Sequence, residues 1–267
     1  MVVVQAQGER PARILALDGW DAVCEFDLAG KSLGRHELKL PEGCAVSMLR
    51  VAHDKDGKRY AIVFHPYDQH GQLYLYDADW KRILDFPKPE DRGQDLIVDA
   101  RLADLDGDGV LEIAVAYTGP TGMQAVKLDG TRLWRNRTDF RRAFQMAVGG
   151  PTADGGRPLY VPNETGMVVV LDREGEPTGK WQIPGQQIIG LFDAELESGK
   201  VAVTGVIPAN DGALTLVGFT PEGRAPRGWR RCRAVRTAFR STSSRRRNCP
   251  ATNRASGWPP VPMVRST

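Results

Sequence analysis

The sequence is poor in the residues that make disulfide or zinc frameworks. Of its 267 residues, 4 are cysteine and 4 are histidine, and no two cysteines have a C-x-x-C spacing. Cys24 and Cys44 could pair with each other, but reduced thiols are the simpler interpretation. His65 and His70 flank a short loop and bring too few further ligands for zinc. A disulfide scaffold and a zinc centre are therefore not expected.

Long apolar runs and helical periodicity are also missing. No stretch of about 18 apolar residues occurs, so the sequence predicts no transmembrane helix. The N-terminus has neither the charged start nor the long apolar core of a signal peptide, and the cellular compartment stays open. No segment before residue 223 has a useful helical period, whereas 29 glycines and 18 prolines supply turns. These absences favour an all-β protein.

Lysine and acidic residues are absent from segment 224–267, whose basic residues are all arginine. It holds 12 of the 36 basic residues, and all 33 acidic residues precede it. Such a tail could neutralise phosphates, but it lacks the aromatic interleaving of a stacking platform, and no nucleic-acid partner is expected. Arginine mixed with serine, proline and alanine is also typical of an out-of-frame reading of a GC-rich gene. We expect this segment to be disordered or frameshifted.

The clearest motif is an alternation of carboxylates and glycines at residues 104–112, Asp-Leu-Asp-Gly-Asp-Gly-Val-Leu-Glu, directly before an apolar strand. Calcium prefers six to eight oxygen ligands, which a tight loop containing glycine can wrap around one ion. An EF-hand is excluded, because its glutamate stands at position 12 between helices. A metal-free Asp/Gly turn is the alternative. The predicted calcium ligands are the side chains of Asp104, Asp106, Asp108 and Glu112 and the backbone carbonyl near Val110.

A second feature of the sequence is a repeat. An apolar strand followed by aspartate and a polar turn recurs, and its anchor positions are 43 to 52 residues apart. Asp/Gly loops that lead into apolar strands lie between the anchors, so each unit contains about four short strands. The Asp129-Gly130 pair predicts a two-residue primed hairpin turn. The anchors are Asp27, Asp77, Asp129, Asp172 and Thr220.

A four-stranded unit repeated about every 48 residues is typical of a β-propeller blade. The predicted fold is all-β, a β-propeller of four-stranded antiparallel blades, with four to five blades in residues 1–223 and a separate tail at 224–267. Five units are few for a closed ring, so we expect an open, partial ring. The strand pattern begins almost at Met1, which we interpret as the absence of an upstream blade.

The chain resembles the FG-GAP or VCBS-type repeat propellers, which are similar to the integrin α-subunit head and to quinoprotein-like (PQQ-repeat) propellers. The resemblance rests on residues 104–115, which match Asp-x-Asp-Gly-Asp-Gly-x-x-acid-apolar, and on the blade phrases at 128–134 and 171–175. It implies that the four carboxylates named above hold calcium. Members of this family are often secreted, periplasmic or on the cell surface.

A second acidic cluster, formed by Asp193, Glu195 and Glu197, is a candidate for another calcium site. Quinoprotein-like propellers carry tryptophans between blades, and three tryptophans here stand near the ends of repeat units. Large aromatic residues at a blade edge more often pack against a neighbouring blade than take part in catalysis, and we interpret these three as packing residues. They are Trp80, Trp134 and Trp181.

Two functional classes fit these features. The first is a non-catalytic binding or scaffold propeller that recognises a protein or glycan with loops at one face, while calcium stiffens the blades. The second is a propeller enzyme, either a polysaccharide lyase or a PQQ-type quinoprotein oxidoreductase. A lyase needs a general base that converges with calcium, and Tyr67, Tyr117 and Arg141 are its first candidates. The loop of Asp68 to His70 could share a face with the Asp104 loop. No catalytic spacing stands out, so the binding class leads.

Overall fold

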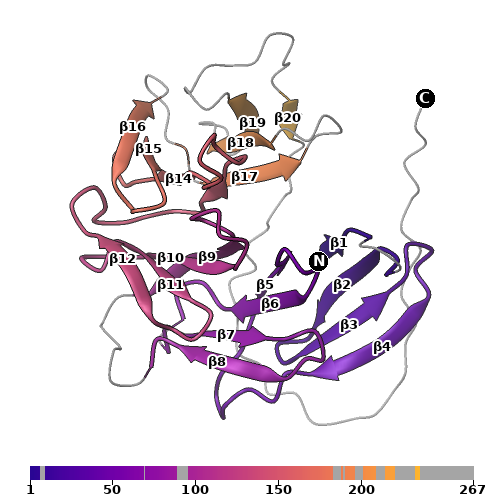
Figure 1. Ribbon diagram of the computed structural model, residues 1–267. Helices are drawn as coiled ribbons and strands as arrows, with labels where there is room; N and C mark the ends of the chain where they lie inside the picture. The colour runs from indigo at the N-terminus through magenta and orange to yellow at the C-terminus, as the bar shows by residue number, and fades with distance from the viewer. Residues whose placement is uncertain are drawn as a thin grey trace, which may run out of the picture. The chain divides into compact units, whose positions relative to one another are not determined.

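The computed structural model contains five four-stranded sheets (Figure 1). Its described residues belong to one compact unit, Met1–Arg236, whereas the unit Thr237–Thr267 lies outside them. Among these residues no helix is long and apolar enough to cross a membrane. The described residues are 1–6, 10–68, 70–88, 96–182, 188, 190–195, 201–208, 214–219 and 232–234.

Each sheet is an antiparallel meander, in which strands that follow each other in the chain are neighbours. Blade 1 contains β1 (Val2–Val4), β2 (Arg13–Asp18), β3 (Ala22–Phe26) and β4 (Ser32–Glu37). Blade 2 contains β5 (Met48–His53), β6 (Arg59–Phe64), β7 (Leu73–Tyr76) and β8 (Arg82–Phe86). Blade 3 contains β9 (Ile97–Ala103), β10 (Glu112–Tyr117), β11 (Met123–Lys127) and β12 (Arg132–Asn136). Blade 4 contains β13 (Ala147–Val148), β14 (Leu159–Pro162), β15 (Met167–Leu171) and β16 (Pro177–Gln182). Blade 5 contains β17 (Gly190–Glu195), β18 (Val201–Pro208), β19 (Leu214–Phe219) and β20 (Cys232–Ala234).

Burial decreases from the middle to the outer strand of a blade. In β10 all six side chains are buried, as expected for a strand that is covered on both faces of the sheet. In the outer strands β4 and β16, exposed and half-buried residues alternate instead. Fully buried strands such as β10 therefore lie in the middle of a blade, and strands in which exposed and half-buried residues alternate lie at its outer edge.

Four hydrophobic clusters hold neighbouring blades together, joining blades 1 and 2, 2 and 3, 3 and 4, and 4 and 5. Within the described part of the chain, no such cluster joins blade 5 to blade 1. Val3, Ile14 and Phe26 share the side of blade 1 that faces away from blade 2, and Val3 there is 50% exposed. The described blades are thus held in series by four apolar interfaces.

The three tryptophans pack between blades, as the packing interpretation predicts. Trp80 is buried in the interface of blades 1 and 2, where its ring stacks on His36 with 5.4 Å between centroids. Trp134 lies so close to Gly175 of blade 4 that a Cβ on this glycine would be 2.5 Å from the ring. Trp181 packs against the cluster of blades 4 and 5.

A five-residue turn recurs in the blades and is organised by the side chain of its first residue. In the turn of Asp27, the Asp27 N–H donates to Lys31 O and the Gly30 N–H donates to Asp27 O, both at 3.0 Å. Asp27 Oδ1 accepts the N–H groups of Ala29 and Lys31. The fourth residue has a positive φ, which favours glycine. The same hydrogen bonds begin at Asp27, Asp54, Asp77, Asn163 and Asp172.

The predicted two-residue turn at Asp129-Gly130 is wrong. The turn spans five residues, because the Lys127 N–H donates to Thr131 O and the Gly130 N–H donates to Lys127 O. A register shift at Val126 accompanies it, as in a type I turn followed by a glycine bulge. The position equivalent to Asp27 is therefore Lys127, and the repeat anchor lies two residues earlier than Asp129.

Blade 5 extends beyond the predicted boundary at residue 223. Its last strand, β20, pairs with β19 through partners such as Leu214 and Ala234. The signal for this strand is weak in the sequence, because it is only three residues long and lies among arginines. The rest of segment 224–267, which was expected to be disordered or frameshifted, lies outside the described residues.

A buried ion-pair network connects the inner strands. Asp99 on β9 is fully buried and accepts from Arg50 Nη2 at 3.2 Å, Arg101 Nε at 3.1 Å and the Met146 N–H at 3.1 Å. Arg101 also lies 3.5 Å from Asp193 of blade 5. Residues of blades 2, 3 and 5 and of the segment that leads into blade 4 are therefore joined by one set of charges.

Removing the Asp99 carboxylate should strongly destabilise the protein. Asp99→Ala leaves Arg50 without its carboxylate in a buried setting, which should lower the free energy of unfolding by about 3–5 kcal/mol. The control is Asp85→Ala, which breaks the half-exposed Arg82–Asp85 pair and should cost less than about 1 kcal/mol. Urea denaturation measures both values, and equal losses would contradict the structural role of the network.

Candidate functional site

The predicted calcium loop joins β9 to β10, and its aspartates lie close together. Side-chain oxygens of Asp104, Asp106 and Asp108 lie within 4.8 Å of one another. Asp104 and Asp106 are half-buried and Asp108 is exposed. The donor set is hard, anionic and made of oxygen, which fits calcium.

Backbone hydrogen bonds shape this loop around its carboxylates. Asp104 accepts the Gly107 N–H at 2.9 Å and the Gly109 N–H at 3.0 Å. Oδ1 of Asp106 accepts the Asp108 N–H, and Oδ1 of Asp108 accepts the Val110 N–H. These bonds also suit a metal-free turn, but they use one oxygen each of Asp106 and Asp108. The second oxygen of each has no hydrogen-bond donor among the described residues.

The loop is held by the blades on both sides. On blade 2, the Lys55 N–H donates to Gly109 O at 3.2 Å, and Lys55 Nζ donates to Asp108 O at 3.1 Å. On blade 4, the Arg157 N–H donates to Leu105 O at 3.0 Å. Gly107 packs against Gly155, so closely that a Cβ would lie 2.6 Å from the Gly155 carbonyl carbon. Glycine at position 107 is therefore required by contact as well as by its φ of 84°.

Two leucines of the same loop anchor it in different cores. Leu105 is buried in the cluster of blades 3 and 4, whereas Leu111 is buried in the cluster of blades 2 and 3. Any ligand that fixes the loop conformation between them would act on both interfaces.

Glu112 is placed differently from the three aspartates. It is 2% exposed, and its Oε2 accepts the Leu105 N–H at 2.8 Å. Burial, opposed by the hydrogen bond from Leu105 and reinforced by the three aspartates, raises the pKa of Glu112 to about 7. Glu112 thus braces the start of the loop, and it is not among the three clustered carboxylates. The side chain of Val110 is exposed.

The second predicted acidic cluster is only partly visible. Asp193 is engaged by Arg101 and accepts the Val148 N–H at 3.3 Å. The side chain of Glu195 and the whole of Glu197 lie outside the described residues. For Asp193 the structure therefore shows a role in the ion-pair network.

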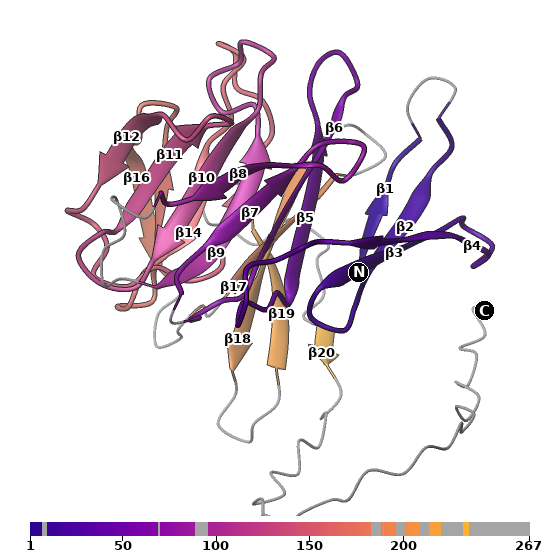
Figure 2. The same ribbon diagram turned by 90° about the horizontal axis from the view of Figure 1, so that it is seen from below.

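Loops gather at two ends of the sheets. If the four strands of a blade are lettered A to D in chain order, the A–B and C–D connections lie at one end of the sheets, which we call the A–B end. The B–C connections and the linkers between blades lie at the other end, which we call the B–C end (Figure 2). The contacts of Gly109 with Lys55 and of Gly107 with Gly155 bring three A–B connections together. The Asp104 loop lies at the A–B end and the Asp68–His70 loop at the B–C end, so the expectation that they share a face is wrong.

The three residues predicted for an enzyme do not converge on the Asp104 loop. Tyr117 is buried, and its hydroxyl accepts from Gln124 Nε2. Tyr67 and Arg141 are exposed at the B–C end, which is the end opposite to the Asp104 loop.

The B–C end carries a row of aromatic and arginine side chains that sequence reasoning missed. Trp20 is 60% exposed and meets His65 edge to face, with 5.9 Å between centroids. Tyr67 is 46% exposed, and the Arg142 guanidinium lies 6.0 Å from its ring and 5.9 Å from that of Phe144. Tyr67 holds a φ of 61°, a strained conformation for a tyrosine. The residues come from three separate parts of the chain, and only the blade arrangement joins them. The Trp20–His65 pair and the group of Tyr67, Arg142 and Phe144 are connected through the β6–β7 connection, which carries both His65 and Tyr67. We call this set of five residues the aromatic row.

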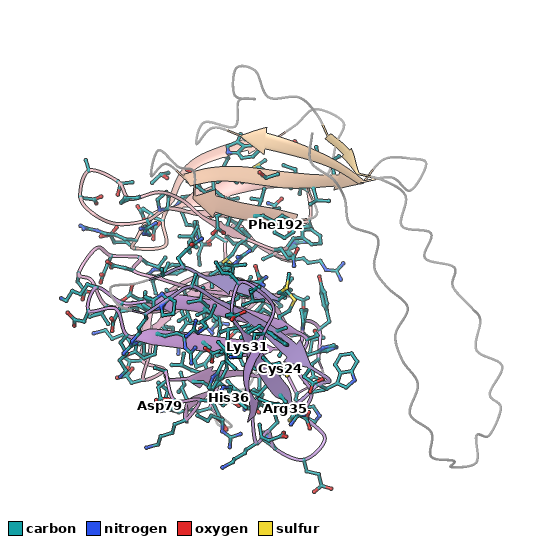
Figure 3. The ribbon with its side chains drawn as sticks, turned by 90° about the vertical axis from the view of Figure 1, so that its right-hand side faces the viewer. Cys24, Lys31, Arg35, His36, Asp79 and Phe192 are labelled. Atoms are coloured by element: carbon teal, nitrogen blue, oxygen red, sulfur yellow. The ribbon has the colours of Figure 1, made fainter. Side chains whose placement is uncertain are left out.

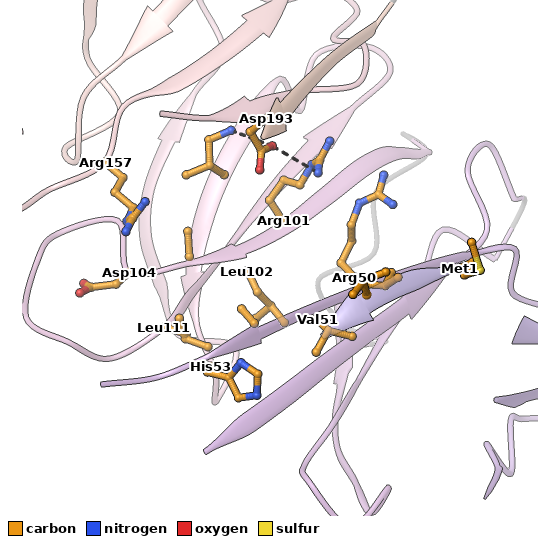
Figure 4. Close-up of a pocket in the computed structure, with 15 residues that line it drawn as sticks. Met1, Arg50, Val51, His53, Arg101, Leu102, Asp104, Leu111, Arg157 and Asp193 are labelled. Atoms are coloured by element: carbon orange, nitrogen blue, oxygen red, sulfur yellow. Dashed lines mark hydrogen bonds and ion pairs between the residues drawn. The ribbon is translucent and has the colours of Figure 1, made fainter. Parts of the chain in front are cut away.

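A cavity of about 540 Å³ lies where the inner strands meet at the A–B end (Figure 4). Arg50, Arg101 and Arg157 line it together with Asp104 and Asp193. Arg50 and Arg101 are already engaged by the buried Asp99, so charges of both signs are nearly balanced here.

Comparisons with known proteins identify the fold. No protein-family model and no curated protein sequence matches the chain. A solved structure of a protein of unknown function from Bacteroides caccae is similar with a TM-score of 0.52 and 18% identity, over 83% of this chain and 73% of that chain. A BBS1N structure in complex with ARL6DN is similar with a TM-score of 0.58 and 16% identity, over 85% of this chain and 62% of that chain. The structure of the Dos1 propeller is similar with a TM-score of 0.50 and 14% identity, over 80% of this chain and 53% of that chain. The chain is therefore a β-propeller, and it spans less than two thirds of the BBS1N and Dos1 chains.

The buried Glu112 should make stability depend on pH when calcium is chelated. Its pKa in the folded protein is about 7, above its ordinary value of 4.5, so the folded state binds the proton more tightly. This contribution is complete below about pH 4.5 and is lost as pH rises to about 7, by roughly 2–3 kcal/mol. Glu112→Gln still accepts the Leu105 N–H but does not titrate. Urea titrations of both proteins in EDTA from pH 4.5 to 8 measure the difference, and parallel pH profiles would contradict this assignment.

Proposed function

We propose that this protein is a calcium-stabilised, non-catalytic β-propeller of the FG-GAP or VCBS type that binds another protein at its B–C end. The observation that carries this proposal is the aromatic row, which spans loops of blades 1 and 2 and the linker between blades 3 and 4. Exposed tryptophan, tyrosine and arginine are the residues that dominate binding energy in protein interfaces.

The BBS1N neighbours support a protein partner, since both were solved in complex with ARL6DN. They share 16% and 13% identity with this chain, so the support concerns the type of module and not the identity of the partner. A propeller offers such a partner a rigid surface, because its loops are fixed by packed sheets.

The charges around the aromatic row favour an acidic partner segment. Arg141 and Arg142 are exposed, and neither guanidinium forms an ion pair with a described residue. Glu164 accepts the backbone N–H of Arg142 at 3.1 Å, which leaves the guanidinium groups available to carboxylates of a partner. Tyr67 and Phe144 flank Arg142 and offer apolar surface beside it. We therefore infer that the partner presents aspartate or glutamate next to apolar side chains.

Calcium in this proposal stabilises the blades from the opposite end. Asp104, Asp106 and Asp108 would hold the ion, and Lys55 and Arg157 connect their loop to blades 2 and 4. An ion that fixes this loop would neutralise three neighbouring carboxylates and would favour the packed arrangement of three blades.

The enzyme alternative has less support. A calcium-dependent lyase needs a base near the ion, whereas Tyr67 and Arg141 lie at the other end of the sheets and Tyr117 is buried.

Calcium should raise the melting temperature of the full-length chain. At a calcium concentration 100 times the dissociation constant, the gain is about 2.7 kcal/mol, which corresponds to about 5–10 °C for a domain of this size. Asp106→Asn should abolish most of this shift. Asp129→Asn is the matched control, since Asp129 lies in a turn of the same blade outside the aspartate cluster. Thermal melts in EGTA and in millimolar calcium measure the shift. If Asp106→Asn retains the full calcium-dependent shift, the Asp104 loop does not bind the ion.

Binding at the aromatic row can be tested with a displayed peptide library selected on the full-length protein. We expect enrichment of peptides that combine acidic and apolar residues, and at least about tenfold weaker binding of these peptides to Tyr67→Ala and Arg142→Ala. Leu28→Ala and Arg132→Ala are the controls, because both residues are exposed at the A–B end.

Two results would contradict the protein-binding proposal. One is enrichment of peptides whose affinity does not change in Tyr67→Ala and Arg142→Ala. The other is a protein that selects no peptide but binds glycans on an array, with binding that is lost in the aromatic-row variants. That result would make the aromatic row a carbohydrate-binding surface.

A further inference from the structure

The A–B ends of blades 1 and 2 enclose a pocket of about 260 Å³ that is rich in arginine. We propose that this pocket binds a phosphate group. It shares His53 with the cavity that Asp104 lines, but none of its residues belongs to the Asp104 loop or to the aromatic row at the other end of the sheets, so the proposal is independent of the proposed function. The residues that carry the argument are Arg10, Arg13, Glu25, His53, Arg59 and Ala78.

The pocket has more positive than negative charge. Glu25 is the one acidic residue among the described residues that line it, against three arginines. Its carboxylate lies 3.3 Å from Arg13 Nε and 3.9 Å from Arg59 Nη1. It is also 3.6 Å from Nε2 of His36, which Figure 3 labels on blade 1. One carboxylate is thus shared by Arg13 and Arg59, and the arginines that line the pocket outnumber it. Asp77 and Asp79 also act on Arg59 from the neighbouring turn, so the excess of positive charge is smaller than the lining residues alone give.

Arg59 has unused hydrogen-bonding capacity at this site. Its side chain is 13% exposed, and Nη2 donates to Ala78 O at 2.5 Å. Its Nε is buried and has no hydrogen-bond partner among the described residues. A buried donor without an acceptor is costly, so Arg59 would gain from a shift of its side chain that brings Nε to an oxygen atom of a ligand.

Neighbouring groups report the same positive field. Burial, together with Arg59 and Arg10, lowers the pKa of His53, and Asp54 opposes this shift. Burial also lowers the pKa of Arg59; Arg10 adds to the shift, and Glu25, Asp79 and Asp77 oppose it. The cationic groups therefore repel one another across the pocket, and an anion placed between them would relieve this repulsion.

Phosphate matches the pocket better than other common anions. A phosphate monoester carries about 1.5 to 2 negative charges at pH 7 and three acceptor oxygens, which suit the charge excess and the forked donors of arginine. A carboxylate carries one charge and would leave part of the excess. The volume is below the range of about 300–1,000 Å³ that is typical of pockets for larger ligands, so the pocket fits the phosphate and a short stem.

The test is calorimetric titration of the full-length chain in EDTA with inorganic phosphate, O-phosphoserine and acetate, at ionic strength held constant with chloride. We expect saturable binding of inorganic phosphate or O-phosphoserine, and at least about tenfold weaker binding of acetate. Tighter binding of O-phosphoserine would identify a phosphate carried by a larger molecule, and equal or weaker binding would identify the free ion. Both results support a phosphate site.

Variants locate the binding in this pocket. Arg10→Gln and Arg13→Gln should weaken phosphate binding at least about fivefold. Arg10 is exposed, so its replacement leaves the fold intact. Arg132→Gln, an exposed arginine on β12, should bind phosphate as the unchanged protein does. The proposal is overturned if neither phosphate ligand shows saturable binding, if acetate binds equally well, or if Arg10→Gln binds unchanged.

Discussion

The sheets of blades 2, 3 and 4 have two apolar faces, each covered by a neighbouring blade, and the fold depends on this cover. The middle strands, of which β10 is the clearest, are buried on either side. A sheet of this kind is not stable alone, so neighbouring blades stabilise each other through the four apolar clusters between them. The buried network around Asp99 adds polar connections where the inner strands meet.

The same constraint explains the division of roles between the two ends of the sheets. At the A–B end, connections pack against the next blade, and the contacts of Lys55 and Gly155 with the Asp104 loop are the main example. At the B–C end, the connections from β2 to β3 and from β6 to β7 leave Trp20 and Tyr67 exposed. The first arrangement suits stabilisation by a cation, and the second suits recognition of a partner.

The sequence allowed the blades to be predicted because their signals are local: short apolar strands, aspartate at the start of a turn, and glycine where φ is positive. The anchor at Asp129 was misplaced, since the turn depends on where β11 ends and on a bulge, and Lys127 carries no side-chain signal for it. The three clustered aspartates could be predicted from spacing alone. The aromatic row could not, because Trp20, Tyr67 and Arg142 are far apart in the chain and meet only through the arrangement of blades.

The Asp104–Glu112 loop couples blade 3 to its two neighbours, and in our proposal calcium acts through this loop. Hydrogen–deuterium exchange of the full-length chain, with calcium and with EGTA, measures this coupling. We expect calcium to slow exchange at Gly107 and Gly109 in the loop and also at Lys55 in blade 2 and Arg157 in blade 4. Unchanged exchange at all four amides, or slower exchange confined to blades remote from the loop, would contradict it.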